Sequence, residues 1–146
     1  LNALLKQIID FAANHTDLYH VRIEQDFDPE LPKLLLDGDQ MRQVAINLIL
    51  NAGAAMGENG ILRLRTFLDA DNQVNIVFSD NGNGIAEEHQ DRIFEPFFTT
   101  KARGTGLGLA ITRQIIEQHH GRITLESRAG EGTTVTIRLP AEQEEY

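Results

Sequence analysis

The sequence predicts an α+β fold, in which helices pack on one face of a mostly antiparallel sheet. Two observations predict this class. Stretches with the apolar period of amphipathic helices are interspersed with stretches that alternate apolar and polar residues, as strands do. The four clearest strands form two pairs joined by short turns, which is typical of antiparallel hairpins. No linker or internal repeat divides the 146 residues, so we expect one domain over residues 1–146.

The composition restricts the classes of function open to the chain. With 41% hydrophobic and 24% charged residues it is ordinary for a globular protein, and the lack of cysteine excludes a disulfide framework, a cysteine zinc site and a thiol nucleophile. A net charge of −9 disfavours a nucleic-acid partner. No apolar run of about 18 residues is present, and no signal peptide opens the sequence. We therefore expect a cytoplasmic domain that makes no membrane contact itself, whether or not its parent protein is anchored.

The first two elements are predicted to be a helix and a strand. Residues 1–13 carry the apolar stripe of an amphipathic helix. Nothing caps the start of this helix, so we expect the chain to be a fragment that begins inside a longer protein. Val21, Ile23 and residues 26–27 indicate the first strand.

A second helix is predicted at residues 40–56. It follows a proline-containing loop and a possible short edge strand at residues 34–36, and Asp37 or Asp39 can cap its start. Its sequence is apolar nearly all round, which predicts a buried helix.

Two asparagines are the only polar side chains in the apolar centre of this helix. Asn47 and Asn51 are four residues apart, so they project from the same face one turn apart. One interpretation is a hydrogen-bonded pair within the core, since an unsatisfied buried amide costs about 1–3 kcal/mol. The other is that the pair faces a polar ligand or metal in a cleft beside the helix, and the weak helix propensity of Asn favours it.

A hairpin follows, with strands at residues 61–68 and 74–80. Its second strand has an apolar row that ends in Asp80, directly before Asn81. One interpretation of Asp80 is an Asx turn that reverses the chain. The other is a carboxylate in an apolar pocket, which would accept a hydrogen bond from a ligand amino group such as that of adenine.

Two glycine-dense turns, at residues 80–84 and 104–108, flank a broken stretch that contains Lys101 and Arg103. A helix that starts in a glycine-rich loop offers free N–H groups to an anion. Neither turn is a Walker A loop or a Rossmann fingerprint. We interpret the stretch as a nucleotide site with a mobile cover.

The elements around the cover are less regular. We expect a short helix within residues 85–93. Phe94 and Phe97 have two interpretations, since each could fill an edge of the core or anchor a hinged lid.

A last helix is predicted from Gly106 to His119 or His120, with Gly121 as its stop. Adjacent histidines do not share a helical face, so we expect the pair to favour the negative end of the helix dipole and not to ligate a metal. The chain then closes with two alternating strands and an acidic tail, at residues 122–127, 133–139 and 141–146.

In this order and at these spacings, the motifs resemble those of the catalytic, ATP-binding domain of bacterial sensor histidine kinases. The superfamily of that domain also holds gyrase, the Hsp90 chaperones and MutL. The resemblance covers essentially the whole chain. The matching motifs are the N box at 47–52, the first glycine box at 80–85, the F box at 94–98, the second glycine box at 104–109 and the closing glycine turn at 130–133.

The resemblance implies a two-layer α/β sandwich with a mixed, mostly antiparallel sheet of about five strands and three helices on one face. ATP would lie between the N-box helix and the lid. Asn51 would ligate Mg²⁺ with Asn47 beside it, Asp80 would read the adenine amino group, and Thr133 would reach the base through a water.

The remaining positions implied by the resemblance are mostly in the glycine boxes. Gly84 and Ile85 would flank the base, backbone amides of residues 106–109 would hold phosphates, and Lys101 with Arg103 would neutralise phosphoryl charge. The complete set of implied ATP-binding residues is Asn47, Asn51, Asp80, Gly82, Gly84, Ile85, Phe98, Lys101, Arg103, Gly104, Thr105, Gly106, Leu107, Gly108, Leu109 and Thr133.

The chain departs from the family pattern in two places. Ala54 and Ala55 stand where many members carry a basic or aromatic residue, so more of the phosphate neutralisation would fall on Lys101 and Arg103. The lid is short, with only residues 99–103 between Phe98 and the second glycine box, as in the nitrogen-regulation-like branch of the family.

Position 47 favours phosphotransfer over ATP hydrolysis. The superfamily's ATPases carry a Glu there as general base, whereas Asn47 cannot take a proton at neutral pH. No histidine of the chain is followed by Glu or Asp as the phosphoacceptor motif requires. We therefore expect no catalytic residue in this chain and an acceptor histidine on a dimerisation domain that precedes Leu1. The expected partners are that domain and the receiver domain of a response regulator.

Two other functions are compatible with the same motifs. One is a serine kinase of the anti-sigma type, with the same fold. The other is an interaction module that senses ADP or ATP without transferring phosphate.

Overall fold

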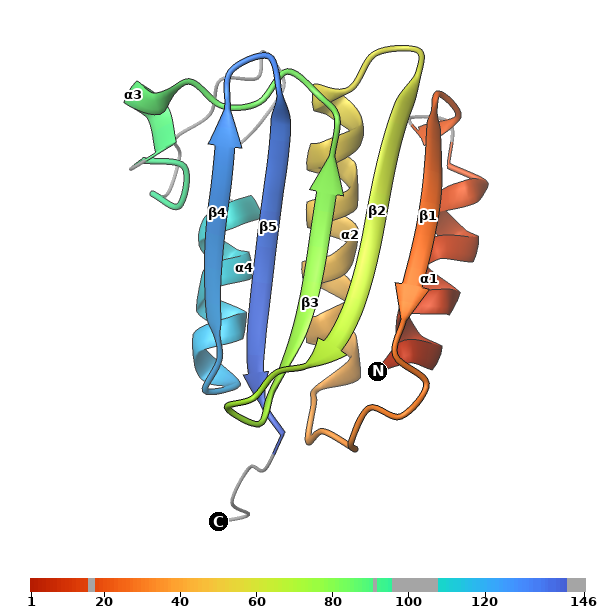
Figure 1. Ribbon diagram of the computed structural model, residues 1–146, viewed down its shortest axis with the longest axis vertical. Helices are drawn as coiled ribbons and strands as arrows, with labels where there is room; N and C mark the ends of the chain where they lie inside the picture. Colours follow the sequence, from red (N-terminus) through yellow and green to blue (C-terminus); the bar gives the residue numbers. More distant parts are fainter. Residues whose placement is uncertain (16–17, 91, 96–107, 142–146) are drawn as a thin grey trace.

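The computed structural model describes residues 1–15, 18–90, 92–95 and 108–141, and within them five strands form one sheet in the order β1-β2-β3-β5-β4 (Figure 1). The pair β1·β2 is parallel and the other three neighbouring pairs are antiparallel. The prediction of a mixed, mostly antiparallel sheet is therefore confirmed. The strands are β1 (Val21–Phe27), β2 (Gly60–Leu68), β3 (Gln73–Asp80), β4 (Arg122–Arg128) and β5 (Gly132–Pro140).

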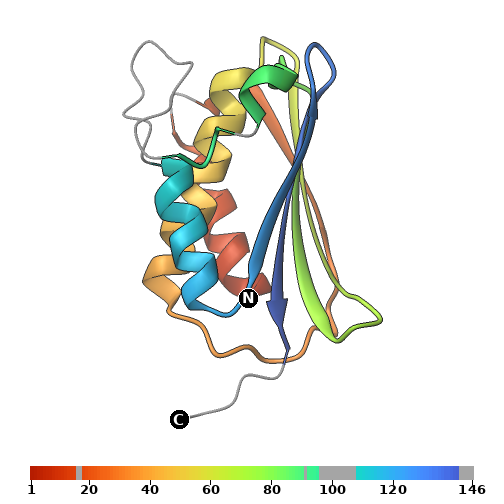
Figure 2. The same cartoon turned by 90° about the vertical axis from the view of Figure 1, so that its left-hand side faces the viewer.

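Three longer helices cover one face of the sheet and leave the other face without helices in the described residues (Figure 2). These are α1 (Asn2–Ala13), α2 (Gly38–Ala55) and α4 (Gly108–Gln118). The middle helix, α2, contacts both α1 and α4. A fourth, single-turn helix α3 (Glu87–Gln90) lies at the end of the sheet where β3 and β4 finish (Figure 1). This is the two-layer α+β arrangement that the sequence predicts.

The alternation in β3 sets which side chains enter the core. Ile76 and Phe78 are 1% and 3% exposed and belong to the core cluster beneath the helices. In the antiparallel register, Phe78 lies opposite Leu64 of β2 and Val135 of β5, both also buried. Burying side chains of this size contributes about 1.5–3 kcal/mol each. Because Asp80 continues the same row, its carboxyl group lies on the helix side at the very end of the strand.

The start of α2 is capped by Asp37, one of the two predicted caps. Its side chain accepts hydrogen bonds from the backbone N–H groups of Asp39 and Gln40, each at 3.1 Å. These bonds satisfy two donors that have no partner within the helix.

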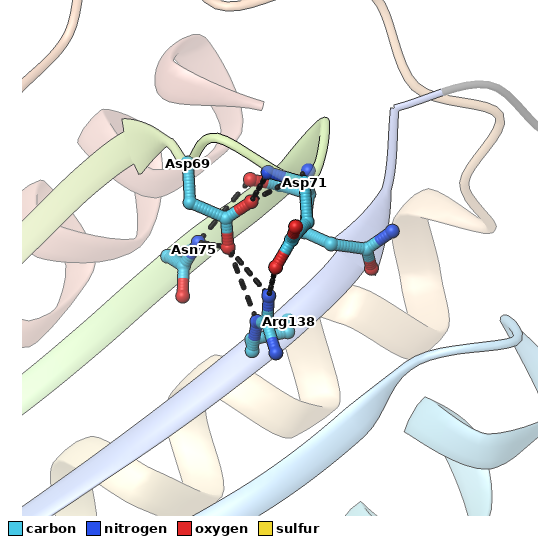
Figure 3. A network of polar contacts seen from close by, with 5 residues as sticks. Asp69, Asp71, Asn75 and Arg138 are labelled. Carbon is cyan, nitrogen blue, oxygen red and sulfur yellow. Dashed lines mark hydrogen bonds and ion pairs between the residues drawn. The ribbon is translucent and has the colours of Figure 1, made fainter.

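The hairpin between β2 and β3 is fixed to β5 by a polar network at the opposite end of the sheet from Asp80 (Figure 3). Oδ2 of Asp69 accepts hydrogen bonds from Nη2 of Arg138 at 2.7 Å and from Nδ2 of Asn75 at 2.8 Å. Oδ1 of Asp69 accepts from the backbone N–H groups of Asp71 and Gln73. The side-chain bond from Asn75, with those from Arg138 and the backbone, holds the pKa of Asp69 well below its usual range.

The edge strand predicted at residues 34–36 is wrong, because the structure assigns no strand there. Leu34 and Leu36 instead pack against the core, while Leu35 is 57% exposed. The apolar residues of this segment cover the core from a loop and do not extend the sheet.

The end of α4 also differs from the prediction. His120, and not Gly121, adopts the left-handed conformation, with φ of 62°. Gly121 has another reason to be small, since a Cβ there would lie 2.6 Å from the carbonyl oxygen of Arg138.

His119 is 8% exposed, and it interacts with the negative end of α4 through a carbonyl of the last turn, as the sequence predicts. Its Nδ1 donates to the carbonyl of Ile115 at 2.8 Å, and its Nε2 accepts from the backbone N–H of Asp37 at 3.0 Å. His119 therefore links the end of α4 to the start of α2.

None of the helices in the described ranges is long and apolar enough to cross a bilayer.

Candidate functional site

The predicted site residues that the structure describes gather at one end of the molecule. This end contains the finish of β3, the turn between β4 and β5, the last turn of α2, the first turn of α4 and α3 (Figure 1). The backbone N–H of Asn83, which lies just beyond β3, donates to the carbonyl of Ala55 at 2.9 Å. Since Ala55 is one turn beyond Asn51, the loop that follows Asp80 is held against the part of α2 that carries the paired asparagines.

Asp80 uses its two carboxyl oxygens differently. Oδ1 accepts hydrogen bonds from the backbone N–H of Gly82 at 2.9 Å and from that of Thr133 at 3.3 Å. The first of these bonds is the Asx turn that the sequence left open. Within the described residues Oδ2 accepts no hydrogen bond, and no buried side-chain oxygen or nitrogen lacks a partner. Oδ2 is therefore open to an outside donor.

The surroundings of Asp80 disfavour its charge in part. Burial raises the pKa of this carboxyl, whereas the hydrogen bonds from the N–H groups of Gly82 and Thr133 lower it. Because burial is the larger effect, the pKa lies above its ordinary value. An ionised Oδ2 in such a place is a strong acceptor for a ligand N–H group.

Three glycines around Asp80 allow chain segments to touch. A Cβ at Gly82 would lie 2.5 Å from the carbonyl oxygen of Ala55, and one at Gly84 would lie 2.0 Å from that of Arg128. At Gly132 a Cβ would lie 2.1 Å from the carbonyl oxygen of Asp80, and its φ of 96° also favours glycine. The first glycine box and the closing glycine turn thus pack backbone against backbone.

A cluster of hydroxyl and amide groups also stabilises the end of the sheet around Asp80. The Oγ of Ser127 accepts from the N–H of Ile85 at 2.7 Å and lies 2.8 Å from the Oγ1 of Thr133. The Nε2 of Gln90, on α3, donates to the carbonyls of Ile85 and Ser127 at 2.9 and 2.8 Å. The cluster joins β4, β5, α3 and the loop after β3.

Ser127 and Gln90 are residues that the sequence interpretation missed. Ser127 had a signal, because it is the polar member of an inward row that also contains Ile123 and Leu125. Gln90 had none, since it lies in a short polar segment.

Neither asparagine of the pair on α2 is fully buried. Asn47 and Asn51 are both half-buried, at the border between the buried Leu48 and the exposed Ala54. Leu50 is also only half-buried, so the expectation of a helix buried on nearly all sides is wrong for this part of α2.

This donor set fits a magnesium ion that is shared with a phosphate ligand. Amide oxygens are hard ligands, and Mg²⁺ typically takes only one or two protein ligands and completes its shell with phosphates and water. In the described ranges no three His, Asp or Glu side chains gather as a metal site. The asparagines would thus contribute part of the shell only.

Gly108 and Leu109 form the first turn of α4 and are half-buried. A Cβ at Gly108 would meet nothing within 4 Å, and the Oγ1 of Thr112 donates to the carbonyl of Gly108 at 2.8 Å. The predicted residues that lie outside the described ranges are Phe97, Phe98, Lys101, Arg103, Gly104, Thr105, Gly106 and Leu107. Phe94 is half-buried, with the guanidinium of Arg113 5.9 Å from its ring centre.

The chain is similar to a family of known proteins over most of its length. The family model for histidine kinase-, DNA gyrase B- and HSP90-like ATPases matches residues 36–143. The sensor histidine kinase ZraS of Escherichia coli (strain K12) is 39% identical over 140 residues, which cover 96% of this chain and 30% of ZraS. The signal transduction histidine-protein kinase AtoS of the same strain is also 39% identical over 140 residues, covering 96% of this chain and 23% of AtoS. The chain thus spans less than a third of these relatives.

Solved structures share the fold. The catalytic domain of histidine kinase ThkA has a TM-score of 0.84 at 35% identity, over 97% of this chain and 92% of that one. ThkA in complex with the response regulator protein TrrA gives 0.80 at 32%, over 97% of this chain and 40% of that one. Full-length ShkA in complex with AMPPNP gives 0.82 at 27%, over 94% of this chain and 29% of that one.

Proposed function

Because the chain belongs to the family of histidine kinase-, DNA gyrase B- and HSP90-like ATPases, as the ATPase domain of a sensor histidine kinase, we propose that it binds Mg²⁺-ATP and transfers the γ-phosphoryl group to a histidine. The histidine lies on a separate phosphoacceptor and dimerisation domain of the same parent kinase. Residues 1–146 are then the catalytic part of a longer protein that works in the cytoplasm.

The open oxygen of Asp80 is the observation that carries this proposal. Oδ1 is occupied by two backbone N–H groups, which fix the direction of the carboxyl group. Oδ2 can then accept the exocyclic amino group of adenine. Gly84 and Ile85 would flank the base, with Ile85 held by Ser127 and Gln90, and the hydroxyl of Thr133 would bind the base through a water.

The phosphates would extend from this corner along α2 toward the start of α4. The side-chain oxygen of Asn51, with Asn47 beside it, would hold Mg²⁺, which would neutralise phosphate charge. The N–H groups of residues 106–109 would bind phosphate oxygens at the N-terminus of α4. Lys101 and Arg103 would add positive charge, and Phe98, Gly104 and Thr105 would complete the lid. The short lid supports placing the chain in the nitrogen-regulation-like branch of the histidine kinase family.

Asn47 supports transfer to a protein group and not to water. A general base for hydrolysis must take a proton, and a carboxamide does not do so at neutral pH. The similarity to ThkA, which has been solved with a response regulator protein, supports a receiver domain as the next partner in the sequence of transfers.

Phosphoryl transfer to an added acceptor domain tests the proposal. The chain is incubated with γ-labelled ATP, Mg²⁺ and the phosphoacceptor domain of its parent kinase. Label on that domain that is lost in acid and kept in alkali is the expected result, as for a phosphohistidine. Acid-stable label would indicate a serine kinase, and nucleotide binding without transfer to any acceptor would indicate a sensing module; either result contradicts the proposal.

A further inference from the structure

We propose that His20 is a positioning residue for the metal-binding end of α2. Its ring holds the last turn of this helix, from Asn51 to Ala55, and so sets how much Mg²⁺ contributes to the affinity for ATP. The inference rests on the proposed function, because it needs Asn51 to be the metal ligand. His20 would touch neither the metal nor the nucleotide, and it would act through the backbone of α2.

A hydrogen bond joins the connection between α1 and β1 to the end of α2. The Nε2 of His20 lies 2.8 Å from the carbonyl oxygen of Gly53, and the two residues are 33 positions apart in the sequence. A carbonyl oxygen can only accept, so the hydrogen of this bond is on Nε2. His20 is half-buried and Gly53 is buried, so water competes little for this carbonyl.

The end of α2 depends on donors from outside the helix, because the last four carbonyls of a helix have no partner within it. This turn contains Gly53, and glycine is a weak helix former. Met56, which follows the helix, is extended, with φ of −103° and ψ of 146°, so the helix lacks the left-handed residue that often closes such an end. The N–H of Met56 reaches the carbonyl of Gly53 at 3.3 Å. The bond from His20 is shorter and therefore holds this carbonyl more tightly.

Two separate segments anchor the last turn. The N–H of Asn83 donates to the carbonyl of Ala55 at 2.9 Å, from the loop that would hold the base. His20 approaches from the connection before β1, and among the described residues it makes no hydrogen bond to the loop after Asp80. Loss of the bond from His20 should therefore change the metal end of the site and leave the base end in place.

Asn51 lies in the turn that His20 holds. In an α-helix each N–H bonds to the carbonyl four residues before it, so the last such bond of α2 joins the N–H of Ala55 to the carbonyl of Asn51. If this turn frays, the backbone of Asn51 loses that bond and its side chain loses its direction. A ligand group must be held within about 0.5 Å of its productive position. The Mg²⁺-dependent part of the affinity should therefore be more sensitive to His20 than the rest.

The length of the side chain at position 20 provides matched variants. The amide nitrogen of Gln is as many bonds from Cβ as Nε2 of His is, whereas the amide nitrogen of Asn is closer to Cβ. His20→Gln therefore keeps a donor near the carbonyl of Gly53, His20→Asn ends short of it and His20→Leu has no donor. Tyr19→Phe is the control from the same connection, because the hydroxyl group of Tyr19 donates to the carbonyl of Asn14 and not to α2.

The test is the ratio of the dissociation constant for ATP in EDTA to that in Mg²⁺, both measured by calorimetry. His20→Leu should lower this ratio by about three- to tenfold, the worth of one hydrogen bond, while the affinity in EDTA stays within about twofold of the wild type. His20→Asn should resemble His20→Leu, whereas His20→Gln and Tyr19→Phe should keep the wild-type ratio. In the ligand-free chain, the amide hydrogens of residues 54–56 should exchange faster in His20→Leu and His20→Asn than in His20→Gln.

Any of three results overturns the inference and leaves the proposed function standing. One is an equal loss of affinity in both buffers for His20→Leu, as a general structural role would give. Another is an unchanged ratio in His20→Leu, and the last is that His20→Asn keeps the ratio as well as His20→Gln does. If His20→Leu folds poorly by circular dichroism, the comparison of His20→Gln with His20→Asn decides. A wild-type chain whose affinity for ATP does not depend on Mg²⁺ overturns both proposals.

Discussion

The N–H of Thr133 donates to Oδ1 of Asp80, and this bond joins two segments that are 53 positions apart in the sequence. It connects the end of β3 to the start of β5, next to the point where Gly132 touches the backbone of Asp80. The carboxylate of Asp80, which would accept the hydrogen bond from the base, is therefore held by two central strands of the sheet, β3 and β5.

Replacing Asp80 with Asn should weaken ATP binding by about 10- to 100-fold without unfolding the chain. The Asn side chain can keep the Oδ1 acceptor for Gly82 and Thr133, but it places an NH₂ group where the adenine amino group needs an acceptor. Calorimetry measures the affinity, and circular dichroism checks the fold. An Asp80→Asn variant that binds ATP as well as the wild type would show that the base lies elsewhere.

The affinity for ATP should fall as the solution becomes acidic. Burial raises the pKa of Asp80 above 3.8, so the folded protein takes up this proton at a higher pH than the unfolded chain does. The raised pKa of Asp80 therefore adds most to the free energy of unfolding of the ligand-free protein below pH 3.8. This contribution is lost as pH rises through the folded pKa. Binding has the opposite sign, since it needs the carboxylate. Affinity measured from pH 8 downward should decline for the wild type and stay flatter for Asp80→Asn; parallel profiles would argue against this role.

Asn51→Ala should abolish most of the dependence of ATP binding on Mg²⁺. The loss of an amide ligand to a charged ion lowers affinity by about tenfold or more when Mg²⁺ is present, and it should change little in EDTA. Gln43→Ala is a suitable control, because Gln43 is an exposed side chain of the same helix. If Asn51→Ala binds ATP more weakly in EDTA by the same factor, the amide does not act through the metal.

Gly132→Ala should lower the free energy of unfolding by about 1–3 kcal/mol, because a side chain is strained at its positive φ and would collide with the carbonyl oxygen of Asp80. Gly57→Ala meets no atom within 4 Å and should change stability by less than about 0.5 kcal/mol. Urea unfolding measures both. Equal losses in the free energy of unfolding for Gly132→Ala and Gly57→Ala would show that the close approach of Gly132 to Asp80 does not require a glycine.

The network around Asp69 should stabilise the fold without affecting the nucleotide. Because the pKa of Asp69 is lowered, its contribution to stability is present above pH 3.8 and is lost as pH falls toward the folded pKa. Asp69→Ala should therefore lower the melting temperature at pH 7 and lower it less at pH 3. Asp71→Ala should have a smaller effect, since Asp71 is 82% exposed and lies 3.4 Å from Arg138. A change in ATP affinity in Asp69→Ala would contradict the separation of the two ends of the sheet.

The sequence predicted the sheet well because alternation in residues such as Ile76 and Phe78 directly reports which face is buried. It failed at Leu34 and Leu36, since an apolar loop that covers a core has the same local composition as an edge strand. The second bond of His119 could not be predicted, because its partner, the N–H of Asp37, is 82 positions away. In the site, Asp80 was found from its place at the end of an apolar row. Gln90 could not be found, because its bonds depend on how α3 meets β4.

Titration of the chain with ATP, in Mg²⁺ and then in EDTA, tests the central claim most directly. We expect one binding site per chain, with an affinity for ATP that EDTA weakens and that Asp80→Asn weakens further in either buffer. An affinity that is the same in both buffers, or the absence of any binding to a folded chain, would contradict it.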